Sequence, residues 1–147
     1  MIIQVLSFNE LVRRPSLLKK LSELTLCGYS GMSEELEFMR SNYKKKQINC
    51  KVFVLRHKSK VIGWSILTKE RGSNFLFKYR TNDLPVYETY IHPNFRRMGF
   101  GLKLLNLAKQ RSGVKQIGVF GLDDTSTAFF KRKGLIDLNL HSCSSSF

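Results

Sequence analysis

The fold of this chain is decided by the stretch Ile91-His92-Pro93-Asn94-Phe95-Arg96-Arg97-Met98-Gly99-Phe100-Gly101-Leu102-Lys103-Leu104-Leu105. A β-rich run ends at Ile91, a basic turn with two glycines follows, and an apolar helical pattern begins. Glycine lets a backbone approach a ligand closely, and the first amides of a helix are unpaired donors at the positive end of its dipole. The order strand, glycine turn, helix therefore predicts a phosphate cradle. The residues that we expect to form it are Arg96, Arg97, Met98, Gly99, Phe100, Gly101 and Leu102.

The spacing of the glycines excludes two other phosphate motifs. The chain has no Gly-x-x-x-x-Gly-Lys-Ser/Thr run, and Leu104 stands where a Gly-x-Gly-x-x-Gly motif needs its third glycine. What remains is Arg-x-x-Gly-x-Gly after a strand that ends in Ile-His-Pro. This pattern resembles the acyl-coenzyme A signature of the GNAT acetyltransferase superfamily. Arg96, Gly99 and Gly101 match its fixed positions.

Two further segments support the resemblance, in the order that the superfamily has them. A hairpin is predicted from Val52–Leu55 and Val61–Leu67, and it carries Ile62-Gly63-Trp64. Downstream, Ala128-Phe129-Phe130-Lys131-Arg132-Lys133-Gly134-Leu135 resembles the superfamily's Ala-x-x-Phe-Tyr-x-x-x-Gly-Phe ending, with Gly134 suited to a helix C-terminal cap. The resemblance covers most of the chain from about Cys50 onward.

The resemblance and the hydrophobic pattern together predict one α/β (α+β) domain. We expect a central, mostly antiparallel twisted sheet, splayed near Ile91, with helices on both faces. The expected elements are a strand over 2–8, a helix from Pro15 to about Leu26 after an Asn9 cap, a helix beginning after Ser33, an extra hairpin within 72–84, a helix over 101–110, a strand over 115–120 and a helix over 125–133.

The resemblance also implies acetyl-coenzyme A as the co-substrate. Its pantetheine arm and acyl carbonyl are expected along the Tyr90 and Ile91 amides, with further contacts from Asp123 and Phe130. These last two residues depart from the superfamily pattern. Asp123 replaces a common asparagine, and Phe130 replaces the tyrosine that protonates the leaving sulfur. Phenylalanine has no proton to donate, so Tyr87, Tyr90 or a water is expected to take that role.

An amine acceptor needs a base, because an amine with a pKa like that of lysine is almost fully protonated at neutral pH. Glu88 is the first candidate, because acids are frequent at this place in the superfamily's Glu-apolar-Tyr-Val-x-Pro run. His92 ranks second, since a histidine before a proline in a turn is more often an exposed residue or a cap. The catalytic residues expected from the sequence are therefore Glu88, Tyr90 and His92.

Composition agrees with a cytoplasmic enzyme. With 147 residues and 42% hydrophobic content, the chain can bury a core without metals or disulfides. We expect one domain over 1–140 and a Ser-rich tail over 141–147. No apolar run is long enough to span a membrane, and the N-terminus lacks the basic start of a signal peptide. The three cysteines have no metal-site spacing, so no metal is expected.

The charge of +14, from 25 Lys and Arg against 11 Asp and Glu, is larger than one coenzyme explains. It predicts an acidic macromolecular partner, which is a nucleic acid, a ribonucleoprotein or an acidic protein surface. The acceptor is then an amine on a protein or another macromolecule, although the acidic group Glu34, Glu35 and Glu37 keeps a small polycation open. The alternative to an N-acetyltransferase is a GNAT-fold module that binds coenzyme A or nucleic acid and catalyses nothing.

Overall fold

The computed structural model describes residues 1–25, 50–68, 85–113, 116–119 and 124–137. Their elements are β1 (Ile2–Ser7), α1 (Phe8–Val12), α2 (Pro15–Thr25), β2 (Cys50–His57), β3 (Lys60–Thr68), β4 (Val86–Ile91), the 3-10 helix η1 (Pro93–Phe95), α4 (Phe100–Ser112), β5 (Gly118–Val119), α5 (Asp124–Arg132) and β6 (Ile136–Asp137). The helix expected after Ser33, the hairpin expected within 72–84 and the tail over 141–147 lie outside the described residues.

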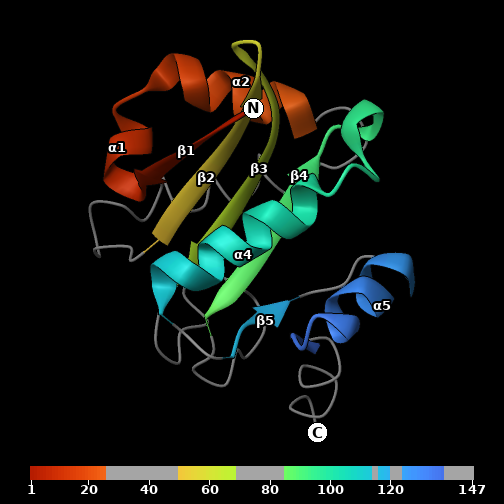
Figure 1. Ribbon diagram of the computed structural model, residues 1–147. Coiled ribbons are helices and arrows are strands. Elements are labelled where there is room, and N and C mark those ends of the chain that lie inside the picture. Colours follow the sequence, from red (N-terminus) through yellow and green to blue (C-terminus); the bar gives the residue numbers. More distant parts are fainter. Residues whose placement is uncertain (26–49, 69–84, 114–115, 120–123, 138–147) are drawn as a thin grey trace, which may run out of the picture.

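The strands form one sheet in the order β1-β2-β3-β4-β5-β6 (Figure 1). The pairs from β1 to β4 are antiparallel, whereas β5 is parallel to both β4 and β6. The expected mostly antiparallel sheet is thus confirmed. Parallel pairing at β4 and β5 requires a crossover, and α4 supplies it.

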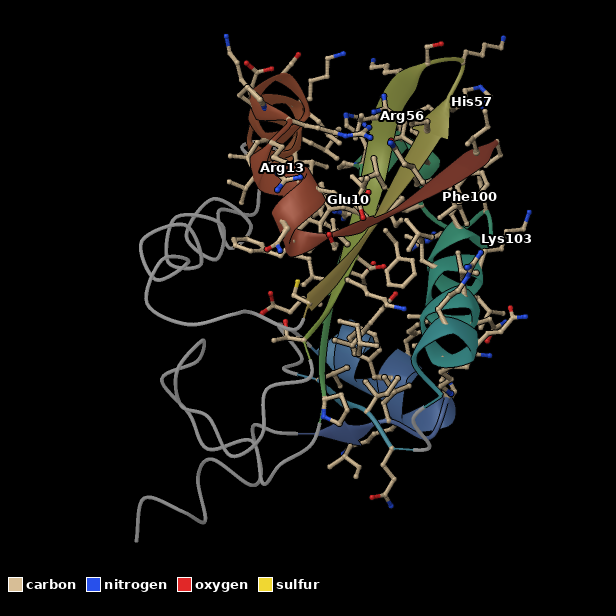
Figure 2. The ribbon with its side chains drawn as sticks, turned by 90° about the vertical axis from the view of Figure 1, so that its left-hand side faces the viewer. Glu10, Arg13, Arg56, His57, Phe100 and Lys103 are labelled. Atoms are coloured by element: carbon tan, nitrogen blue, oxygen red, sulfur yellow. The ribbon has the colours of Figure 1, made fainter. Side chains whose placement is uncertain are left out.

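Helices cover both faces of the sheet, with α1 and α2 on one face and α4 and α5 on the other (Figure 2). Alternating residues of the strands divide between the two cores. The core under α1 and α2 contains Val52, Val54, Trp64, Ile66 and Tyr90, and the core under α4 and α5 contains Phe53, Leu55, Leu67, Tyr87 and Phe130.

The N-terminal prediction was wrong in its boundary and its cap. The strand stops at Ser7, one residue earlier than expected, because Ser7 and not Asn9 caps a short helix. The Ser7 side chain accepts a hydrogen bond from the Glu10 amide at 3.1 Å, and the Glu10 carboxylate accepts one from the Ser7 amide at 3.3 Å. This reciprocal capping box satisfies two amides and starts α1 one residue after Ser7.

The contact of β3 with β4 is tightest where the glycine turn begins. Gly63 lies opposite Ile91, and a Cβ on Gly63 would come within 2.8 Å of Ile91 Cδ1 and 3.0 Å of the Tyr90 carbonyl oxygen. The His92 amide extends the pairing by donating to the Ile62 carbonyl at 2.8 Å. Glycine at position 63 therefore sets how closely the end of β4 is held against β3.

We predict that Gly63→Ala lowers the free energy of unfolding by about 1–3 kcal/mol, because the added methyl overpacks this contact. Denaturant unfolding measures the change. Ile91→Val removes the nearer of the two clashing atoms, so in the Gly63→Ala background it should restore part of the loss. A Gly63→Ala variant as stable as the wild type would contradict the tight contact.

Candidate functional site

The turn between β4 and α4 has the backbone that the sequence predicts for a phosphate cradle. After Ile91 the chain makes η1, and Arg97 and Gly99 then adopt left-handed conformations with φ of 63° and 82°. Gly99 is the N-cap of α4 and forms no side-chain cap hydrogen bond. The first intrahelical bond runs from the Lys103 amide to the Gly99 carbonyl, at 3.1 Å.

The N-terminus of α4 is open to an anion. No acidic side chain lies in its first turn, and a Cβ built on Gly99 or Gly101 would meet no atom within 4 Å. The amides of the first turn lack intrahelical acceptors, and the dipole of a 13-residue helix is positive at this end. Arg97 and Met98 are exposed, while Phe100, Gly101 and Leu102 are half-buried. The local geometry fits a diphosphate held by backbone donors.

The edge of β4 next to the turn is unpaired on one side within the described residues. There β5, which is described only as far as Val119, pairs with β4 at Val86 and Tyr87. Because the His92 amide points to β3, the alternation of an antiparallel ladder directs the Ile91 amide to the edge away from β3 and the Tyr90 amide back to β3. Of the two amides expected to bind the acyl arm, Ile91 is thus the one on the edge away from β3.

Glu88 lies on β4 opposite Ile66, on the face covered by α1 and α2. Among the described residues, its neighbours on that face of the two strands are Trp64, Ile66 and Tyr90. Glu88 itself is half-buried. Desolvation by this burial raises the pKa of Glu88 to about 7. At neutral pH the carboxyl group therefore exchanges protons readily, as a general base requires.

Trp64, Tyr90 and Arg96 stack on one another at the end of β4, an arrangement that was not expected from the sequence. The Tyr90 ring stacks on Trp64 with centroids 6.3 Å apart, and the Arg96 guanidinium lies 5.3 Å from the Tyr90 centroid. Arg96 Nε also donates to the Ile91 carbonyl at 2.8 Å. Arg96 thus braces the end of β4 in addition to adding charge to the turn. The two-residue periodicity of Trp64 with Ile66 and of Glu88 with Tyr90 carried the signal for this shared face.

His92 serves as a cap in this structure. Its Nδ1 accepts a hydrogen bond from the Asn94 amide at 3.2 Å at the start of η1, and its ring contacts Phe95 with centroids 6.1 Å apart. The Nδ1 lone pair is therefore engaged in the cap.

Phe130 is buried in the core under α4 and α5, and its ring meets Phe129 edge-on at 5.5 Å between centroids. Tyr87 packs in the same core. Burial raises the pKa of Tyr87 to about 12, so its hydroxyl keeps its proton at neutral pH. Asp123 lies outside the described residues. In the described part of the chain, no three His, Cys, Asp or Glu side chains group as metal ligands, and no helix has the length and hydropathy to span a membrane.

A comparison with protein families matches residues 18–135 to the acetyltransferase (GNAT) family. Since the match covers most of the sequence, the chain belongs to this family. A comparison with curated proteins finds no match.

Solved structures of acetyltransferases share the fold. An acetyltransferase from Clostridium acetobutylicum, solved with acetyl-CoA, has a TM-score of 0.59 and 11% identity over 92% of this chain and 90% of its own. An aminoglycoside N-acetyltransferase in complex with CoA has a TM-score of 0.52 and 14% identity, and the match covers 93% of this chain and 92% of that enzyme's chain. The protein smu.2055 from Streptococcus mutans has a TM-score of 0.50 and 15% identity. The match covers 76% of this chain and 65% of the Streptococcus mutans chain.

The position of Glu88 predicts a pH dependence of stability. A carboxyl group whose pKa is raised on folding holds its proton more tightly in the native state than in the unfolded state. The free energy of unfolding therefore falls as the pH rises from 4.5, the ordinary pKa of a glutamate, to about 7, the pKa of Glu88 in the native protein. We expect Glu88→Gln to remove this fall, so the variant gains melting temperature relative to the wild type across that interval. Thermal melts at several pH values measure it.

The control for this experiment is Glu23→Gln on α2, whose carboxylate is exposed and pairs with Lys19 at 4.0 Å. It should not gain stability over the same pH interval. If the difference between Glu88→Gln and the wild type is the same at pH 5 and pH 8, Glu88 titrates normally and its burial has no influence.

Proposed function

We propose that this protein is an acetyl-CoA-dependent N-acetyltransferase, with the pyrophosphate of the coenzyme on the first turn of α4 and Glu88 as the general base. The observation that carries the proposal is the placement of a half-buried carboxyl group on β4, three residues before the Ile91 amide on the strand edge away from β3. The left-handed turn and the open space at Gly99 and Gly101 support the coenzyme site. Membership of the family supports the reaction class.

In this reaction the amine nitrogen forms a bond to the thioester carbonyl carbon, and the carbon–sulfur bond breaks. The Ile91 amide donates to the carbonyl oxygen, where negative charge develops. Glu88 takes the amine proton, directly or through a water. The Trp64 Nε1 hydrogen has no acceptor among the described residues, so it is available to hold such a water on the Glu88 face.

The departing thiolate takes its proton from Tyr87 or from water, because Phe130 has none to give. Burial raises the pKa of Tyr87 to about 12, which makes its hydroxyl a weaker acid and favours water as the donor. The rival function, a coenzyme-binding module without catalysis, draws its support from Phe130. The raised pKa of Glu88 favours the enzyme, since burying a carboxylate without a function only lowers stability.

The acceptor that this face favours is an amine whose surroundings are not strongly cationic. Arg96 lies over the ring of Tyr90, which is two residues after Glu88 on β4. The exposed residues Arg13, Arg14 and Lys20 belong to the segment that forms α1 and α2 on the Glu88 side of the sheet. A small polycation is repelled by these charges, whereas an amine on a protein or another macromolecule with acidic groups nearby is attracted. We therefore place a macromolecular amine ahead of a polyamine or an aminoglycoside.

Glu88→Gln should lower turnover by roughly 100-fold or more at neutral pH, the usual contribution of a general base. Its affinity for CoA should not change, because Glu88 does not contact the phosphate turn. The defect should shrink at high pH, where the free amine becomes abundant. Steady-state kinetics with a panel of amines and peptides measures this, with coenzyme A release as the readout. Wild-type turnover by Glu88→Gln would return the base role to His92 or to solvent.

Gly101→Glu should abolish measurable CoA binding while the protein still folds. The new side chain enters open space on the protein side, but it brings bulk and a negative charge to the place of the phosphates. Calorimetry with CoA measures the affinity. Asn106→Glu is the matched control, because it adds the same charge at an exposed position further along α4 and should bind CoA normally. Equal affinities for the two variants would move the phosphate site away from α4.

A further inference from the structure

The end of the molecule that carries the phosphate turn also carries the turn between β2 and β3. The ring of His57, at the end of β2, contacts the ring of Phe95 with centroids 5.7 Å apart. The His92 amide bonds to the Ile62 carbonyl near the start of β3. Figure 2 shows His57 on the same side of the sheet as Phe100 and Lys103 of α4. Two segments far apart in sequence thus form one surface.

Four exposed cations define this surface, which we name the basic rim. They are Lys58 and Lys60 at the hairpin turn, Arg97 in the phosphate turn and Lys103 on α4. No acidic residue occurs in 56–63 or in 92–103. In the part of the chain that the structure describes, a single ion pair is formed, and it joins Lys19 to Glu23 on α2. The charges of the basic rim are therefore uncompensated within the described residues.

Aromatic and apolar side chains belong to the same end of the molecule. Phe95 and Phe100 are half-buried and pack with one side against the core under α4 and α5, and the Lys103 ammonium lies 6.0 Å from the Phe100 centroid. Met98 is 60% exposed in the middle of the turn. Cations that track a phosphate backbone, interleaved with aromatic groups on which bases stack, are the combination that binds single-stranded nucleic acid without sequence preference. An acidic peptide needs the cations but not the rings.

We propose that the basic rim binds single-stranded nucleic acid, as a function separate from acetyl transfer. Coenzyme A alone does not account for it, because the backbone amides of α4 suffice for a pyrophosphate and leave the side-chain charges of Lys58 and Lys60 unused. The net charge of +14 provides the long-range attraction that brings a polyanion to the protein, and the rim supplies the contacts.

The test measures the affinity of the whole protein for a labelled oligouridylate of about 12 nucleotides by fluorescence anisotropy, between about 0.05 and 0.3 M salt. Each phosphate neutralised on a single strand contributes about −0.7 to the slope of log K against log salt concentration, so the four rim cations predict a slope near −2.8. Acetyl-CoA and acceptor are absent, so the result does not depend on the proposed enzyme activity.

Two double variants with equal loss of charge separate the rim from the charge of the whole protein. Lys58→Gln with Lys60→Gln should reduce the slope to about −1.4 and weaken binding by about 25-fold at 0.1 M salt. Lys131→Gln with Arg132→Gln neutralises two exposed cations on α5, which lies far from the hairpin turn in Figure 1, and should leave the slope unchanged. Far-UV circular dichroism confirms that both variants fold.

Three results would overturn the proposal. The first is no binding at 0.05 M salt, and the second is an equal loss in the two double variants, which would reduce the effect to net charge. The third is tighter binding of an oligoglutamate of the same length, which would assign the rim to an acidic protein. Weaker binding of a duplex of equal length supports the proposal, because paired bases are not free to stack on Phe95 and Phe100.

Discussion

The site depends on the close pairing of β3 with β4. That pairing is in register from Thr68 and Val86 to Gly63 and Ile91, and the His92 amide extends it by one hydrogen bond. It fixes the end of β4, and the described part of β5 pairs with β4 at the other end, at Val86 and Tyr87. A strand that is held along one edge presents the backbone donors of its other edge in a rigid position. The position of β4 determines the positions of the other parts of the site, because Glu88 lies on this strand and the glycine turn follows it.

The two faces of β4 carry different titratable groups. Glu88 and Tyr90 point to the core under α1 and α2, whereas Tyr87 belongs to the core under α4 and α5. Strand alternation thus places the carboxyl group of Glu88, the proposed base, on one side of the sheet and the hydroxyl of Tyr87 on the other. Burial raises the pKa of both groups, but with opposite functional results. Glu88 is brought to about 7, where it accepts protons, and Tyr87 to about 12, where it retains its own.

Local signals explain which parts of the fold were predictable. Arg-x-x-Gly-x-Gly after Ile-His-Pro located the turn because glycine takes left-handed φ values at little cost, and Gly99 has one. The helix from Pro15 was likewise encoded by neighbouring residues, whereas Lys58 and Ser59 take left-handed φ values although neither is a glycine or an asparagine. The Ser7 and Glu10 residues of the capping box are present in the sequence pattern, but Asn9 was predicted as the cap because asparagine and serine are equally good caps by residue type. The contact of His57 with Phe95 joins residues remote in sequence, so no local pattern signals it.

Arg96 shows why a motif position and a structural role differ. The sequence assigns it to the phosphate turn as a charge, but its Nε bonds to the Ile91 carbonyl and its guanidinium lies over Tyr90. An arginine makes both contacts because its planar head donates at the edge and stacks through its face, which lysine does not do. The residue therefore connects the turn to the strand whose Ile91 amide lies on the edge away from β3. The exposed charge at this end of the molecule is then carried by Arg97 and Lys103 and by the hairpin residues Lys58 and Lys60.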